Sequence, residues 1–227
     1  MLRRNLREVR REIRAAASAM GRDPTEVTVV AVAKGLPARL VRWAIDEGVT
    51  DIGENYVNEL AAKRDELGAP AAAVRWHFVG VLQSSTAHRV ADLADVVHSI
   101  GSLHAAERLS RRARREGRRV PALIQVDFAG GRNGVAPEDV DAAVGRVRDM
   151  DGITLRGLMT LPPMGERPED ARPYFARLRE LRDGVERTRG ELPELSMGMS
   201  EDYQVAVEEG ATMVRIGTAL FGSRPTE

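Results

Sequence analysis

The sequence predicts an α/β fold, specifically a single (β/α)8 TIM barrel with one extra helix at its N-terminus. Short runs of apolar, β-branched residues alternate with longer segments of helical periodicity, and this alternation indicates a parallel sheet covered by helices. Eight such strand–helix units fit into about 200 residues, which favours a closed barrel over an open sheet. No linker-like or low-complexity stretch divides the 227 residues, so we expect one domain that spans residues 1–227.

Residues 1–20 are expected to form an amphipathic helix packed on the outside of the barrel. Apolar side chains recur there at helical spacing between arginines and glutamates, at Leu2, Leu6, Val9, Ile13, Ala16, Ala17 and Met20. Glu8 and Glu12 argue against a transit peptide, because such peptides are poor in acidic residues. Gly21 and Asp23-Pro24 are expected to end the helix.

The segment 27–33 predicts the first strand. Four of its seven residues are valine, and the run is closed by Gly35 and Pro37, which is typical of a strand buried on both faces. By the same reasoning, further strands are expected at 49–53, 75–80, 95–98, 121–127, 153–159, 194–198 and 212–216. The helices that follow the strands are expected at 37–47, 55–67, 84–93, 102–116, 137–149, 168–188 and 200–209, with a short turn or helix at the C-terminus.

The composition narrows the classes of function. The chain is 43% hydrophobic but only 4% aromatic, so its core is aliphatic, and its formal net charge of 0 gives no field that attracts nucleic acid or a membrane. The absence of cysteine excludes disulfides, zinc–thiolate sites and thiol catalysis. The seven arginines between residues 107 and 119 are interpreted as a solvated helix face, because no aromatic residue among them offers stacking. We expect a cytoplasmic protein with no nucleic-acid or membrane partner.

Lys34 is the first candidate site residue. It follows the first predicted strand, and the carboxyl ends of barrel strands are where such folds place their ligands. The chain has only two lysines, Lys34 and Lys63, among 34 basic residues. A buried lysine can lose its proton, whereas arginine cannot, and a neutral amine can form a Schiff base with a carbonyl group. The alternative is a structural lysine whose stem covers the strand end.

A phosphate site is expected after the last two strands, where barrels commonly build one. Ser200 begins the predicted helix 200–209, and Gly217 and Thr218 follow the last strand, so their backbone N–H groups form a cluster suited to an anion. For Ser200 the alternative is a plain helix N-cap.

Four further residues on or next to predicted strands are interpreted either as parts of a ligand site or as structural residues. Arg215 interrupts an apolar strand, so its guanidinium needs a partner, either a ligand ring nitrogen or a carboxylate such as Glu54. Asn55 either binds a ligand or caps the second helix. His77 is interpreted as a hydrogen-bonded core histidine, and Met159 as a wall of the pocket.

These positions together describe a ligand with an aldehyde and a phosphate. Pyridoxal 5'-phosphate (PLP) fits, with its imine at Lys34, its phosphate at Ser200, Gly217 and Thr218, and its ring nitrogen near Arg215. A phosphosugar bound by a lysine-imine aldolase also supplies a carbonyl and a phosphate, so the spacing alone does not decide between them.

The chain resembles the pyridoxal phosphate homeostasis proteins (the YggS/PROSC family) over nearly its whole length. The motifs that carry the resemblance are Ala31-Val32-Ala33-Lys34, Asp51-Ile52-Gly53-Glu54-Asn55-Tyr56-Val57-Asn58-Glu59, Trp76-His77-Phe78-Val79-Gly80, Gly157-Leu158-Met159-Thr160, Leu195-Ser196-Met197-Gly198-Met199-Ser200 and Val214-Arg215-Ile216-Gly217-Thr218-Ala219-Leu220-Phe221-Gly222. The family usually reads Leu-Gln-Ser-Asn-Lys where residues 82–86 are Leu-Gln-Ser-Ser-Thr, and the turn 128–134 also differs. We therefore do not assign ligand exchange or a second cofactor site to these two loops.

The resemblance implies a barrel related to the N-terminal domain of bacterial alanine racemase, with PLP held as an imine on Lys34. It implies that Ser200, Gly217 and Thr218 hold the phosphate, that Arg215 faces the pyridine nitrogen and that Asn55 lines the pocket; Met159 is retained as pocket wall. It also implies cofactor storage and delivery, with PLP-dependent apoenzymes as recipients, rather than an assigned catalytic activity. No catalytic residue and no metal ligand is assigned.

An amino-acid racemase is the second hypothesis and a lysine-imine aldolase the third. Racemisation needs a base on each face of the cofactor, and the related racemases take a tyrosine base from another domain of a partner subunit. The only tyrosines here are Tyr56, Tyr174 and Tyr203, and Tyr203 is expected on the outside of its helix. We expect a monomer.

Overall fold

Eight parallel strands close into a barrel in the order of the sequence, with β1 (Thr28–Val32) paired to both β2 (Asp51–Glu54) and β8 (Met213–Ile216). Ala31 lies between its register partners Ile52 and Ile216, and this double pairing closes the sheet. The remaining strands are β3 (Arg75–Phe78), β4 (Val96–Ile100), β5 (Val120–Val126), β6 (Ile153–Thr160) and β7 (Glu194–Ser196). The structure, a computed structural model, describes residues 1–131 and 133–222. It confirms the predicted barrel.

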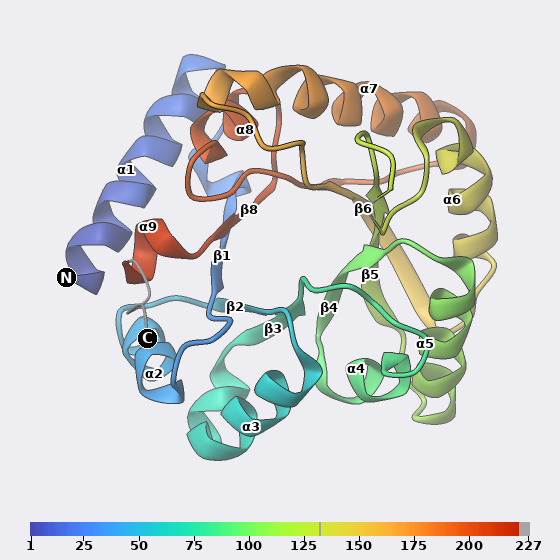
Figure 1. The fold of residues 1–227 in the computed structure, drawn as a ribbon, viewed down its shortest axis with the longest axis horizontal. Helices are drawn as coiled ribbons and strands as arrows, with labels where there is room; N and C mark the ends of the chain where they lie inside the picture. Colours follow the sequence, from blue (N-terminus) through green and yellow to red (C-terminus); the bar gives the residue numbers. More distant parts are fainter. Residues whose placement is uncertain (132, 223–227) are drawn as a thin grey trace.

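Helices form the outer layer and surround the strands (Figure 1). The extra N-terminal helix α1 (Leu2–Ala19) packs against α8 (Tyr203–Glu208) and α9 (Thr218–Phe221), which flank β8. The others are α2 (Ala38–Asp46), α3 (Val57–Leu67), α4 (Ala87–Leu93), α5 (Leu103–Arg115), α6 (Val140–Arg148) and α7 (Arg172–Arg189). Among the described residues, no helix is both long enough and apolar enough to cross a membrane.

Several helices begin later than their periodicity predicts. The segments expected to start at 137 and 168 open with 3-10 turns, Pro137–Asp139 and Pro168–Ala171, before α6 and α7 begin. The helix expected at 200 begins at Tyr203, because the Asp202 side chain accepts the Met199 N–H at 2.6 Å and closes a turn first. Local turn chemistry thus overrides apolar spacing at helix starts.

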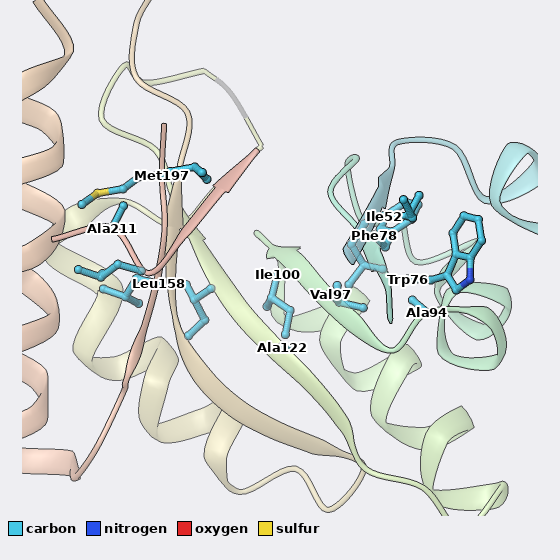
Figure 2. Close-up of a cluster of buried hydrophobic side chains, with 14 of the residues drawn as sticks. Ile52, Trp76, Phe78, Ala94, Val97, Ile100, Ala122, Leu158, Met197 and Ala211 are labelled. Carbon is cyan, nitrogen blue, oxygen red and sulfur yellow. The ribbon is translucent and has the colours of Figure 1, made fainter. Parts of the chain in front are cut away.

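Each strand has an outer face packed on the helices and an inner face that fills the barrel, because side chains alternate along a strand. The outer-face cluster in Figure 2 includes Ile52, Trp76 and Phe78 on one side of the barrel and Leu158 on the other. Val30, Val96, Leu123, Met159 and Met213 form a separate apolar cluster of the opposite strand parity, in the barrel interior. Met159 is therefore buried inside the barrel, on β6.

Candidate functional site

Lys34 follows β1 by two residues, at the carboxyl end of the barrel, as predicted. Its side chain is half-buried, and among the described residues it has no hydrogen-bond or ion-pair partner. The beginning of α9 lies close by, since a Cβ built on Gly217 would sit 3.5 Å from the Val32 carbonyl oxygen. The end of β1, which leads to Lys34, and the start of α9 therefore lie side by side at the barrel mouth.

The second lysine of the chain fixes the backbone on both sides of Lys34. Lys63, on α3, is buried and donates to the Ala33 carbonyl at 2.7 Å, to Glu54 Oε1 at 2.5 Å and to Glu59 Oε2 at 3.0 Å. Glu59 Oε2 in turn accepts the Gly35 N–H at 2.7 Å. The residues before and after Lys34 are thus held by one charged cluster, which restricts where the amine can lie.

Glu54 pairs with Lys63, so the suggested pairing of Arg215 with Glu54 is wrong. Glu54 is the last residue of β2, and strand alternation turns its side chain outward to α3 rather than into the barrel. Burial raises the pKa of the Glu54 carboxyl to about 7, although the Lys63 ammonium opposes the shift. Its Oε2 atom is buried without a hydrogen-bond partner, which adds to the cost of ionising it.

Asn55 lies at the mouth of the barrel but does not cap the following helix. Tyr56 is the N-cap of α3, and no side-chain capping bond is present there. The half-buried Asn55 is held instead by the neighbouring β3 loop: a Cβ at Gly80 would lie 1.9 Å from the Asn55 carbonyl oxygen, so only glycine permits this approach. Asn55 thus remains available to a ligand.

Ser200 lies in the turn before α8, so it is not the N-cap of that helix. Its Oγ accepts the backbone N–H of Gly217 at 3.2 Å and of Ala219 at 3.1 Å. The structure therefore brings Ser200 together with Gly217 and the start of α9, where Thr218 is exposed. Because both N–H groups donate to Ser200 Oγ, they fix this hydroxyl beside the start of α9, and its own hydrogen remains as a donor for an anion. We call this arrangement of Ser200, Gly217 and Ala219 the phosphate cradle.

Gly198 makes this arrangement possible. Its φ is +89°, and a Cβ there would lie 2.5 Å from the Ala206 Cβ. The backbone at Gly198 therefore packs closely against Tyr203 and Ala206 of α8. The Gly198 carbonyl accepts the Arg215 N–H at 2.9 Å. The loop that carries Ser200 is thereby joined to β8, which leads to Gly217.

Arg215 lies inside the barrel and is only 4% exposed. Its guanidinium donates to Ser196 Oγ at 2.6 Å and to the Thr160 carbonyl at 2.8 Å. Burial lowers the pKa of Arg215 to about 10, while the charge of Asp202 acts in the opposite direction, so the side chain is a cation at neutral pH.

A line of polar side chains continues from Arg215 through the barrel. Ser196 Oγ lies 2.8 Å from His98 Nδ1, His98 Nε2 lies 2.8 Å from His77 Nδ1, and His77 Nε2 lies 2.8 Å from Asp51 Oδ1. His77 is fully buried with both ring nitrogens partnered, which confirms its interpretation as a core histidine.

Tyr203 is turned away from the barrel mouth. Its hydroxyl donates to Glu12 on α1, and burial together with this carboxylate raises its pKa. A cavity of about 340 Å³ lies beside it and is bordered by Glu8, Glu12 and Ser200. The glutamates make that cavity unfavourable for phosphate, so the side of Ser200 that faces Gly217 is the better phosphate site.

Sequence reasoning missed Lys63, His98, Ser196 and Ala219 as parts of the site. The signal for Lys63 was its rarity, and for His98 and Ser196 it was a polar residue inside an apolar strand. The atypical loop 82–86 forms the turn before α4, and the loop 128–134 includes residue 132, which lies outside the described residues.

Comparison with known proteins gives one consistent relationship over almost the whole chain. The family model described as "Alanine racemase, N-terminal domain" matches residues 3–225. A pyridoxal phosphate homeostasis protein of Pseudomonas aeruginosa is 43% identical over 223 residues, which cover 97% of this chain and 94% of that protein.

Solved structures agree with this relationship. PipY of Synechococcus elongatus without PLP has a TM-score of 0.85 at 34% identity, over 98% of this chain and 100% of that one. The form of PipY with PLP bound has a TM-score of 0.82 at 35% identity, over 93% and 100% respectively. Alanine racemase of Clostridium difficile shares the fold, with a TM-score of 0.76 at 16% identity over 100% of this chain and 57% of that one.

Proposed function

Because this chain belongs to the family of pyridoxal phosphate homeostasis proteins, we propose that it binds PLP covalently at Lys34 and stores and delivers it within the cell. The single observation that carries the proposal is the Lys34 amine, which has no partner among the described residues while Lys63 and Glu59 hold the backbone on both sides of it. A structural lysine would be expected to pair or to extend into solvent.

The residues at the barrel mouth suit the chemistry of PLP. When bound, the cofactor supplies an aldehyde carbon and a phosphate. Lys34 would hold the cofactor covalently through that carbonyl carbon, whose oxygen would leave as water. Ser200, Gly217 and Thr218 would hold the phosphate; the support is that Ser200 Oγ is fixed beside the start of α9 by the N–H groups of Gly217 and Ala219.

The remaining candidates take up positions around the ring. Arg215, which is held by Ser196 and Thr160, would lie at the pyridine nitrogen, and a guanidinium cation there would keep that nitrogen unprotonated. Asn55 lines the mouth of the pocket, and Met159, buried on the inner face of β6, forms its apolar wall. An unprotonated ring nitrogen makes the ring a poorer electron sink.

Racemisation is the second candidate function, because the exposed Tyr56 directly follows Asn55 at the barrel mouth. Tyr203, the other tyrosine near the cradle, is bound to Glu12 and has a raised pKa, so it is a poor base. Loss of optical activity from an L-amino acid incubated with the loaded protein would favour racemisation, and no loss would favour the carrier. As a carrier, the protein is proposed to be a cytoplasmic monomer that delivers PLP to PLP-dependent apoenzymes.

The covalent link is tested by mixing the purified protein with PLP, reducing it with borohydride and locating the added mass. We expect wild type to turn yellow and to carry one label, on Lys34, whereas Lys34→Ala and Lys34→Arg stay folded by circular dichroism and unlabelled. A label on Lys63, or equal labelling of Lys34→Arg, would contradict the assignment.

The phosphate cradle is tested by comparing PLP with pyridoxal, which lacks the phosphate. Ser200→Ala is expected to weaken PLP binding by about tenfold and to leave pyridoxal binding unchanged, because one hydrogen bond to a charged group is lost. The exposed Ser85→Ala serves as the matched control. Equal weakening of both ligands would argue that Ser200 acts through the fold.

A further inference from the structure

The polar line inside the barrel is a hydrogen-bond chain with a single direction. Arginine can only donate, so Ser196 Oγ accepts from Arg215 and directs its own hydrogen to His98 Nδ1. His98 then carries its proton on Nε2 and donates to His77 Nδ1. His77 in turn carries its proton on Nε2 and donates to Asp51. For neutral imidazole rings, the guanidinium at one end and the carboxylate at the other thus fix both tautomers.

The two ends of the chain carry opposite charges. The Asp51 carboxylate forms an ion pair with Arg75 at 2.7 Å and accepts the Thr50 hydroxyl at 2.6 Å. The hydrogen bonds from His77 and Thr50, together with this ion pair, hold the pKa of Asp51 below its usual value despite burial. Burial keeps the pKa of His98 well below its usual value, and the Arg215 cation acts in the same direction. The Arg215 cation and the Asp51 carboxylate thus lie at opposite ends of the hydrogen-bond chain.

No carboxylate forms a hydrogen bond or ion pair with Arg215 among the described residues, and the charge of Asp202 acts on it only from a distance. Among the described residues, its hydrogen-bond partners are the Ser196 hydroxyl and the Thr160 carbonyl, both neutral. A buried cation without a contacting counter-charge is costly. Aligned hydrogen bonds polarise one another, so the negative charge of Asp51 acts on Arg215 through the chain.

We propose that Asp51, His77, His98 and Ser196 are positioning residues that fix the pose and the charge of Arg215 at the ring end of the site. This inference rests on the proposed function, because the role of Arg215 is defined by a PLP ring. The chain begins at the amino end of β2 and crosses from β4 to β7, so residues far from the barrel mouth set the properties of the pocket.

The first test needs no cofactor. Two-dimensional ¹⁵N NMR of the histidine rings reports their tautomers directly. The protein has only four histidines, and the exposed His88 and His104 serve as references. We expect the neutral rings of His77 and His98 to be Nε2–H tautomers with slowly exchanging ring protons. An Nδ1–H tautomer at either position would overturn the proposal.

The second test measures PLP binding after the negative charge of Asp51, at the far end of the hydrogen-bond chain, has been removed by substitution. Asp51→Asn keeps the size and an accepting oxygen, and we expect it to weaken PLP and pyridoxal equally, by about tenfold, and to shift the absorption maximum of the bound cofactor. Ser196→Ala should do the same, Asp51→Glu should restore part of the loss, and the exposed His104→Asn is the control.

The outcomes separate the two proposals. If wild type binds no PLP, the proposed function fails while the NMR result still decides the direction of the chain. If wild type loads and Asp51→Asn matches it in affinity for both ligands and in spectrum, the positioning role fails. Loss confined to PLP would also contradict it, because that pattern belongs to the phosphate cradle.

Discussion

At the scale of single residues, the pair formed by Glu54 and Lys63 has a consequence for stability that extends beyond the site. Burial of the Glu54 carboxyl raises its pKa to about 7. The folded protein therefore holds this proton over a pH range in which the unfolded chain has released it, and stability from this group falls as the pH rises from about 4.5 to 7. Lys63 reduces the effect but does not reverse its direction.

Glu54→Gln is expected to remove this pH dependence, because glutamine keeps an accepting oxygen for Lys63 and cannot ionise. Relative to the variant, wild type should lose about 2 kcal/mol of unfolding free energy between pH 4.5 and pH 7. Urea unfolding at the two pH values measures this. The exposed Glu66→Gln on the same helix is the control, and parallel pH profiles for Glu54→Gln and wild type would contradict the prediction.

At the scale of elements, the loop between β7 and α8 depends on one backbone conformation. Gly198 adopts a positive φ and has Ala206 and Tyr203 against the position of a Cβ. Gly117 also has a positive φ, of +64°, but nothing lies within 4 Å of its Cβ position. A substitution at Gly117 thus tests backbone strain alone, whereas one at Gly198 tests the strain together with a steric clash.

Gly198→Ala is expected to lower the free energy of unfolding by about 3 kcal/mol, and Gly117→Ala by about 1 kcal/mol, since only the first adds a clash to the strain. Denaturant unfolding of both variants measures the difference. Gly198→Ala should also weaken PLP binding, because the loop carries Ser200. Equal stabilities would show that the loop relaxes around the added methyl group.

The strands β1 and β6 were predictable because they lie in apolar runs rich in β-branched residues or leucine, and both end within a residue of their expected positions. Helix starts were not, because Pro137, Pro168 and Asp202 build turns that periodicity does not report. Lys34, Ser200 and Gly217 were predicted as site residues by the rule that barrel ligands gather at the carboxyl ends of strands, and the structure places all three at that end. The link from His98 to Ser196 was missed, because the contact joins β4 to β7 across the barrel interior.

At the scale of the whole molecule, α1 stabilises the corner that holds the cradle. Leu6, Val9 and Ile13 are buried where α1 packs on α8 and α9, and the Tyr203 hydroxyl is bound by Glu12 of the same helix. Because α8 follows Ser200 and α9 follows Gly217, the N-terminal helix supports both halves of the cradle.

Ile13→Ala is expected to cost about 3 kcal/mol of unfolding free energy, the usual effect of emptying a buried aliphatic site. The loss should appear in one cooperative transition seen equally by tryptophan fluorescence and circular dichroism, because α1 packs on the barrel itself. The adjacent exposed Arg14→Ala is the control. A separate early transition would show that α1 unfolds independently of the barrel.

Lys63 is buried and paired with two carboxylates, so Lys34 is the one lysine side chain that an amine-reactive reagent can reach in the folded protein. An acylating dye or a resin bearing activated esters meets Lys34 and the N-terminal amine in the native protein, while Lys63 is shielded. The barrel mouth can therefore be tagged, tethered or blocked chemically without engineering the sequence.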